Sequence, residues 1–124
     1  MKVLIVDDTQ TLRSLIQIYL GAKGWEFIEA RDGAEGLSRA RSSRPDVVIS
    51  DVKMPIMDGF ELCAAIRSDP ALRHLPVLLL TMLGDDASRQ RGRLVGASAF
   101  LTKPVTPAAL KETIGKVTGA RIAT

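Results

Sequence analysis

The sequence alternates short apolar runs with longer segments of helical periodicity, and this order repeats five times along the chain. Strand-then-helix units repeated in this way predict a parallel β-sheet with helices packed on both faces. Parallel strands that are buried on both faces read as continuous apolar runs rather than alternating ones. We predict strands at Val3–Val6, Trp25–Ala30, Val47–Ser50, Val77–Leu80 and Ala99–Leu101, most of which are such runs.

Each apolar run is followed by a segment that can form a helix. The first carries Leu12, Leu15, Ile16, Tyr19 and Leu20 at helical spacing, with Thr9 or Asp8 available as its N-cap. Further helices are expected over about Gly33–Arg41, Gly59–Ser68 and Pro107–Val117. The segment Asp85–Val95 is the weakest helix, with Ala87, Leu94 and Val95 as its apolar anchors. Gly92 in its interior costs about 1 kcal/mol relative to alanine.

The length and composition indicate one globular domain. The chain has 124 residues, of which 46% are hydrophobic and 25% charged, so it can build a single core. We expect a domain over residues 1–119 and a short C-terminal tail over 120–124. The net charge of +3 is spread over several helices and aromatic residues make up only 4%. Direct binding of nucleic acid is therefore not expected.

No segment suggests a membrane span or a secretion signal. The apolar runs are far shorter than the roughly 20 residues that cross a bilayer, and two acids follow the N-terminal run where a signal peptide has small residues. We therefore expect a cytoplasmic protein. The single cysteine, Cys63, is expected to be a buried thiol, and the single histidine, His74, to lie on a surface loop.

Polar residues that can carry chemistry collect at the ends of the predicted strands. Asp7 and Asp8 end the first, Asp51 the third, Thr81 the fourth and Lys103 the fifth. In a parallel sheet these ends share one edge, which is where such folds bind ligands. Carboxylates gathered there repel one another by about 4 kcal/mol per pair at ~4 Å, so a cation is expected. Oxygen ligands suit Mg²⁺.

Each of these residues also has an ordinary structural interpretation. Asp8 can be a helix cap, Asp51 an acid at a strand end, Thr81 a cap before a loop, and Lys103 a solvated cation. Their joint placement favours a functional site, because a purely structural domain has no reason to gather three acids and a lysine at one edge.

The motifs at these positions resemble the receiver domain of bacterial two-component response regulators, of the chemotaxis type that stands alone. The similarity rests on Asp7-Asp8, Asp51-Val52-Lys53-Met54-Pro55, Met57-Asp58-Gly59, Thr81, Gly96-Ala97 and Phe100-Leu101-Thr102-Lys103-Pro104. It extends from Lys2 to about Val117 and implies a flavodoxin-like strand order of 2-1-3-4-5.

By this resemblance the chain is a signalling switch rather than an enzyme. Asp51 would accept a phosphoryl group from a sensor histidine kinase or a histidine phosphotransfer protein. Mg²⁺ would be held by Asp8, Asp51 and the backbone carbonyl of Lys53, with Asp7 acting through water. Thr81 and Lys103 would hold phosphoryl oxygens, and the bond from Lys103 to Pro104 would be cis. Phe100 would be the aromatic residue that turns inward on activation.

Three residues bear on the lifetime of the phosphoryl group, and two of them, Lys53 and Met82, depart from the family pattern. Lys53 and Leu83, two residues after Asp51 and Thr81, flank the route of the hydrolytic water in similar domains. Neither has a carboxylate or amide to position water, and the bulky Met82 can crowd the entrance. Slow loss of phosphate is therefore expected.

The output surface is expected at the helix over Asp85–Val95, the strand with Phe100 and the last helix, where a target protein binds or the domain dimerises. Arg89 and Arg93 share a face of that helix, and Asp86 can pair with Arg89. Two alternatives stay open: an interaction module that works without phosphorylation, and the receiver fragment of a longer DNA-binding regulator. Resemblances to aspartyl-phosphate hydrolases and flavin-binding proteins are weaker, since the spacing of the acids and the first loop do not match.

Overall fold

The computed structural model describes residues 1–21, 24–82 and 84–119. Within them, five parallel strands form one sheet in the order β2-β1-β3-β4-β5, which confirms the expected strand order. The strands are β1 (Lys2–Val6), β2 (Glu26–Ala30), β3 (Val47–Asp51), β4 (Val77–Thr81) and β5 (Ala99–Thr102). The helices are α1 (Gln10–Leu20), α2 (Gly33–Ser43), α3 (Gly59–Ser68), α4 (Asp86–Leu94) and α5 (Pro107–Thr118).

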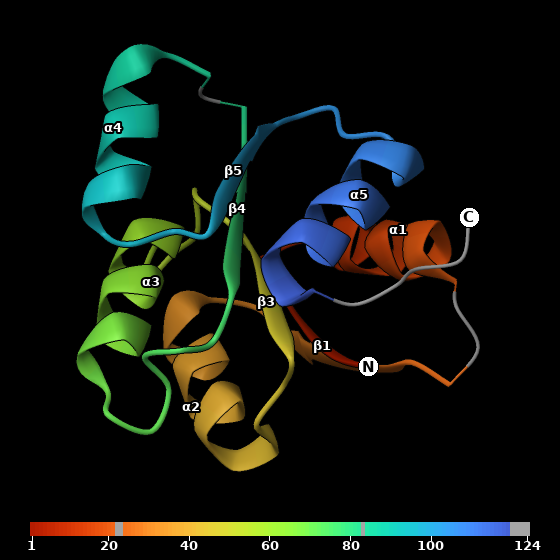
Figure 1. The fold of residues 1–124 in the computed structure, drawn as a ribbon, viewed down its shortest axis with the longest axis horizontal. Coiled ribbons are helices and arrows are strands. Elements are labelled where there is room, and N and C mark those ends of the chain that lie inside the picture. Colours follow the sequence, from red (N-terminus) through yellow and green to blue (C-terminus); the bar gives the residue numbers. More distant parts are fainter. Residues whose placement is uncertain (22–23, 83, 120–124) are drawn as a thin grey trace.

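Helices cover both faces of the sheet, as predicted. Helices α2, α3 and α4 lie on one side, and α1 and α5 lie together on the other (Figure 1). The two faces of β1 show how the core is divided. Leu4 and Val6 pack into the apolar cluster under α2 and α3, whereas Val3 and Ile5 pack into the cluster under α1 and α5. The central strands β1, β3 and β4 are thus buried on both sides, which explains why they read as continuous apolar runs.

Strands β3, β4 and β5 end one residue later than the apolar pattern alone predicts, whereas β1 and β2 end where predicted. Asp51 is the last residue of β3 and Thr81 the last residue of β4. Both polar residues are therefore positioned by pairing between strands and not by a loop. The expected tail over residues 120–124 lies outside the described residues.

Local sequence signals fix the ends of several helices. Asp58 and Glu61 form a reciprocal capping box at the start of α3, and Thr106 caps α5 just before Pro107. At α1, Thr9 occupies the predicted N-cap position, but its side chain makes no cap hydrogen bond. Its hydroxyl donates to Asp7 Oδ1 instead, at 2.7 Å. Thr9 is therefore the N-cap residue, as predicted, and its hydroxyl fixes the Asp7 carboxylate.

Helix α4 forms as predicted, but two of its predicted anchors were wrong. Ala87 is exposed and Leu94 is 78% exposed; of the three, Val95 packs against the core. The inward surface is instead centred on Gly92, which is buried. A Cβ at Gly92 would lie 2.9 Å from Cδ2 of Phe100, so the absence of a side chain lets the helix approach the ring.

Candidate functional site

The carboxyl edge of the sheet brings together the acids predicted from the strand ends. Asp7, Asp8 and Asp51 each offer a carboxylate oxygen, and these oxygens lie within 4.8 Å of one another. Asp7 is buried, Asp51 is half-buried and Asp8 is exposed. The cluster is therefore anchored on the core side and open to solvent on the other. Carboxylate oxygens are the ligands that Mg²⁺ prefers, so the donor set fits the ion expected from the sequence.

Asp7 is held on every side by hydrogen bonds. Its N–H donates to Ala30 O at 3.0 Å, which ties it to the end of β2. Its Oδ1 accepts from the N–H and the hydroxyl of Thr9, at 2.9 and 2.7 Å. Its backbone carbonyl accepts from Arg13 Nη1 at 2.6 Å. The turn that carries Asp7 and Asp8 is thus fixed before any ligand arrives.

Lys103 reaches into the acid cluster from the end of β5. Its Nζ lies 3.1 Å from Asp51 Oδ1 and 3.7 Å from Asp7 Oδ2, and its side chain is only 15% exposed. The peptide bond from Lys103 to Pro104 is cis, as the resemblance implied. A point charge at this place can balance part of the acid cluster and can also meet an incoming anion.

The Asp51 carboxyl group has an altered acidity. Burial raises its pKa above the ordinary value of 3.8, and the charge of Asp7 acts in the same direction. Lys103 and the N–H of Val52, which donates to Oδ1 at 2.9 Å, act in the opposite direction. The net result is a carboxylate that burial has made costly to ionise and that a nearby cation stabilises.

Gly59 supports Asp51 in a way that the sequence pattern did not explain. Its N–H donates to Val52 O at 2.8 Å, and a Cβ on Gly59 would collide with the backbone carbonyl of Asp51. Only glycine lets the first turn of α3 approach this closely. The sequence does place Gly59 in the Met57-Asp58-Gly59 motif. The motif alone, however, does not indicate why glycine is needed at this position.

Thr81 and Phe100 lie in different surroundings. Thr81 is buried at the carboxyl end of β4, and its carbonyl accepts from Lys103 N at 2.7 Å. Phe100, on β5, faces α3 and α4 instead of the acid cluster. Its ring stacks on Phe60, with centroids 6.5 Å apart and planes 16° apart. Thr81 thus ends a strand at the edge of the sheet that carries the acids, whereas the Phe100 ring packs against α3 and α4.

Arg89 has other partners than the one predicted. Its Nη2 donates to Thr102 Oγ1 at 3.2 Å, and its guanidinium lies 5.6 Å from the centroid of Phe100. The predicted pairing with Asp86 was wrong, because the aromatic ring and the threonine hydroxyl both lie on the inward side of α4. Arg89 and Arg93 do share a face, and together they line a hollow of about 240 Å³ beside Phe100.

The residues expected to affect loss of phosphate lie at the rim. Lys53 is exposed in the loop after β3. Met82, directly after β4, is 74% exposed, so most of its side chain is in solvent. The third residue of this prediction, Leu83, lies outside the described residues.

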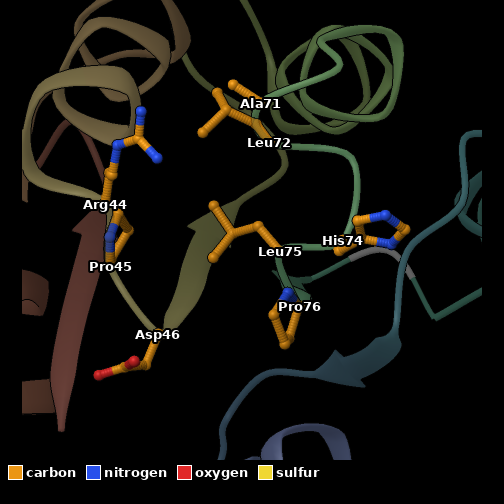
Figure 2. Close-up of a pocket in the computed structure, with 8 residues that line it drawn as sticks. All are labelled: Arg44, Pro45, Asp46, Ala71, Leu72, His74, Leu75 and Pro76. Carbon is orange, nitrogen blue, oxygen red and sulfur yellow. The ribbon is translucent and has the colours of Figure 1, made fainter.

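A separate hollow lies at the opposite, amino-terminal edge of the sheet. It measures about 290 Å³ and lies between the loops that precede β3 and β4. Figure 2 shows Arg44 and Pro45 on one side and Leu72, Leu75 and Pro76 on the other. His74 lies at its margin and is exposed, as predicted.

The single cysteine, Cys63, is buried, as predicted, and burial raises the pKa of its thiol.

Comparison with known proteins agrees with this fold. The family model of the response regulator receiver domain matches residues 3–115. The response regulator PleD of Caulobacter vibrioides is 41% identical over 104 residues, which cover 84% of this chain but only 23% of PleD. The polar-differentiation response regulator DivK of Brucella anthropi is 33% identical, over 94% of this chain and 95% of DivK. The chain thus spans less than a quarter of one relative and nearly all of another.

The solved structures show the same similarity. The chemotaxis protein CheY4 of Vibrio cholerae superposes with a TM-score of 0.86 at 40% identity, over 94% of this chain and 97% of CheY4. A sheet of this strand order, with acids and a lysine at its carboxyl edge, defines a receiver-type signalling domain. This chain belongs to the response regulator receiver domain family, whose members act as phosphorylation-dependent switches. None of the helices in the described ranges has the length and apolar character of a membrane span.

Proposed function

We propose that Asp51 is the phosphoacceptor of this receiver. The observation that carries the proposal is the contact between Lys103 Nζ and Asp51 Oδ1, at 3.1 Å, beside two further carboxylates. A carboxylate at a strand end, held by a lysine and open to solvent, can attack a phosphorus atom. The nearby acids explain why such a site needs a metal cation before a phosphoryl group can approach.

We assign the cation as Mg²⁺, held by Asp8, Asp51 and the backbone carbonyl of Lys53, with Asp7 acting through water. Two of these acids are partly or fully open to solvent, which suits an ion that keeps several of its waters. When bound, Mg²⁺ supplies positive charge against the phosphoryl oxygens. The fixed turn at Asp7 holds Asp8 in place for this purpose.

The transfer itself needs little more than positioning and charge. An Asp51 carboxylate oxygen forms a bond to phosphorus as the P–N bond of a phosphohistidine breaks, and the imidazole leaves with the electron pair of that bond. Lys103 exchanges its contact with Asp51 for one with a phosphoryl oxygen, and the Thr81 hydroxyl donates to another. The donor is a sensor histidine kinase or a histidine phosphotransfer protein. Slow loss of phosphate then resets the switch.

The change is passed on through Phe100 and α4. As Thr81 moves toward the phosphoryl group, Phe100 turns inward, and its contacts with Gly92 and Arg89 must rearrange. Helix α4 has few apolar anchors, so little burial opposes this movement. The surface formed by α4, β5 and α5 then binds a downstream protein or a second phosphorylated copy. We place this switch in the cytoplasm, without direct contact to nucleic acid.

Phosphorylation by acetyl phosphate tests the assignment. We expect the wild type to take up one acid-stable, base-labile phosphate in Mg²⁺, and Asp51→Asn to take up none while keeping its circular dichroism spectrum. Asp46→Asn is the matched control, because Asp46 is an exposed aspartate at the opposite edge of the sheet. Uptake by Asp51→Asn at the wild-type rate would show that another residue is the acceptor.

A further inference from the structure

A buried arginine lies directly behind the acid cluster. Arg13, in the first turns of α1, is only 6% exposed. Its Nη1 donates to the backbone carbonyl of Asp7 at 2.6 Å, and its Nε donates to Glu29 Oε1, on β2, at 3.0 Å. Its Nη2 lies 3.4 Å from Gln10 Oε1. An arginine is rarely buried unless its charge is paired and its N–H groups are bonded.

The contact with the Asp7 carbonyl fixes the peptide that joins Asp7 to Asp8. The carboxylate of Asp7 is already held by Thr9, and its N–H by Ala30. The carboxylate of Asp8 is exposed, so its position depends on the backbone of this turn. Arg13 bonds that backbone from the core side, by a hydrogen bond from a charged donor. Removing the arginine would free the peptide that aims Asp8.

Glu29 balances the charge of Arg13. Without a charge partner, a guanidinium this close to a cation site would repel the cation, because charges at short range interact strongly inside a protein. The Glu29 carboxylate, 38% exposed on its other side, neutralises it. The pair therefore holds the turn with little net charge of its own.

From these contacts we infer that Arg13 is a positioning residue for divalent cation binding at Asp7, Asp8 and Asp51, with Glu29 as its charge partner. The inference rests on the Mg²⁺ site of the proposed function. Residues that orient metal ligands without touching the metal typically change metal affinity by about 10-fold to 100-fold when removed. Arg13 does not touch the reacting atoms, so its effect must appear in cation binding.

The test compares variants that separate positioning from charge and from general stability. Arg13→Met with Glu29→Gln removes one positive and one negative charge, so the net charge stays the same and only the hydrogen bonds are lost. The control for general stability is Arg67→Met, which loses partly buried hydrogen bonds of an arginine to backbone carbonyls and also one positive charge. Arg67 donates to the carbonyls of Gly96 at 2.8 Å and Leu75 at 2.6 Å, and these lie at the far edge of the sheet.

Binding of Mn²⁺ is measured by the electron paramagnetic resonance signal of the free ion. Mg²⁺ is then added as a competitor. We expect the Arg13→Met/Glu29→Gln protein to bind Mn²⁺ about 10-fold more weakly than the wild type. Arg67→Met should bind like the wild type even if its melting temperature falls. Arg13→Lys should recover part of the affinity. If the double variant does not fold, Arg13→Lys carries the test. Its ammonium is a point charge without the planar fork by which Arg13 bonds Asp7 O and Glu29 from two different nitrogens, so the Arg13→Lys protein should bind Mn²⁺ more weakly than the wild type.

Glu29→Gln provides a second measurement, because it keeps the hydrogen bond to Asp7 but leaves the arginine charge unbalanced. It should weaken Mn²⁺ binding most at low salt. If the wild type binds Mn²⁺ and the double variant or the folded Arg13→Lys protein binds equally well, Arg13 is structural only and the Mg²⁺ site stands. Equal weakening by Arg67→Met would also overturn the inference. If the wild type itself binds no Mn²⁺ that Mg²⁺ displaces, the proposed cation site fails and the inference fails with it.

Discussion

The ring of Phe100 lies so close to Gly92 that a Cβ added at Gly92 would come within 2.9 Å of Cδ2 of the ring. The glycine that weakens α4 as a helix is therefore the residue that lets α4 pack on the sheet. This contact joins the proposed output surface to the residue proposed to sense phosphorylation. Its energetics can be tested directly.

Gly92→Ala should lower the free energy of unfolding. Alanine improves helix propensity by about 1 kcal/mol, but forcing a methyl group against a packed ring costs about 1–3 kcal/mol. We expect a net loss of about 1 kcal/mol, measured by urea denaturation. In a Phe100→Leu background the ring is gone, so the same change should become stabilising. If Gly92→Ala stabilised the wild type, the ring would not be packed as the structure shows.

The raised pKa of Asp51 predicts how stability depends on pH. The folded state binds this proton more tightly than the unfolded state, so stability from this group decreases as pH rises from about 3.8, its ordinary value, through the raised pKa. Above the raised pKa, Asp51 is ionised in both the folded and the unfolded state, and the full cost of burying its charge lowers the stability. Asp51→Asn should therefore melt at a higher temperature than the wild type at pH 7 in EDTA, and this advantage should shrink as the pH falls toward 4.

The control for this prediction is Glu26→Gln, which neutralises an exposed carboxylate on β2. It should give no comparable gain. A lower melting temperature for Asp51→Asn at pH 7 would mean that the contact with Lys103 outweighs the cost of burying the charge, contrary to the net direction of the pKa shift.

Most of the fold could be predicted from the sequence because the sheet is buried on both faces. Runs such as Val3–Val6 and Val77–Leu80 leave few other options, and the polar residues that follow them then fall on one edge. The inward face of α4 could not be predicted, because its contacts are made by Gly92 and Arg89 rather than by apolar side chains. Arg13 was missed for a similar reason, since its burial depends on a backbone carbonyl and on Glu29 from another strand.

The phosphoryl group should persist for minutes or longer once formed. Lys53, exposed at the rim, offers neither a carboxylate nor an amide to orient water toward phosphorus. Introducing an amide should therefore shorten the lifetime, so Lys53→Asn should lose phosphate several-fold faster than the wild type, measured by release of labelled phosphate in Mg²⁺. Lys53→Met is the matched control and should stay slow. A wild-type half-life of seconds would contradict the prediction.

The last prediction concerns the proposed partner surface, where Arg93 is exposed and Arg89 is half-buried against Phe100. We expect an acidic patch on the partner to contact these arginines, with charge complementarity acting mainly on the association rate. Arg89→Glu with Arg93→Glu should then weaken binding of the phosphorylated protein at low salt without slowing phosphorylation of Asp51. The two residues differ, because Arg89→Glu also removes the contact with Thr102.

Single variants separate these two effects. Arg93→Glu should slow association and leave the environment of Phe100 unchanged in NMR spectra, whereas Arg89→Glu should change both. Arg39→Glu carries the same charge change on an exposed position of α2, on a surface away from Phe100, and should bind like the wild type. Surface charges act over roughly 10 Å at 0.1 M salt, so the effect of Arg93→Glu should fade as salt is raised. Binding that is unchanged by the double variant at low salt would show that the partner does not contact this face.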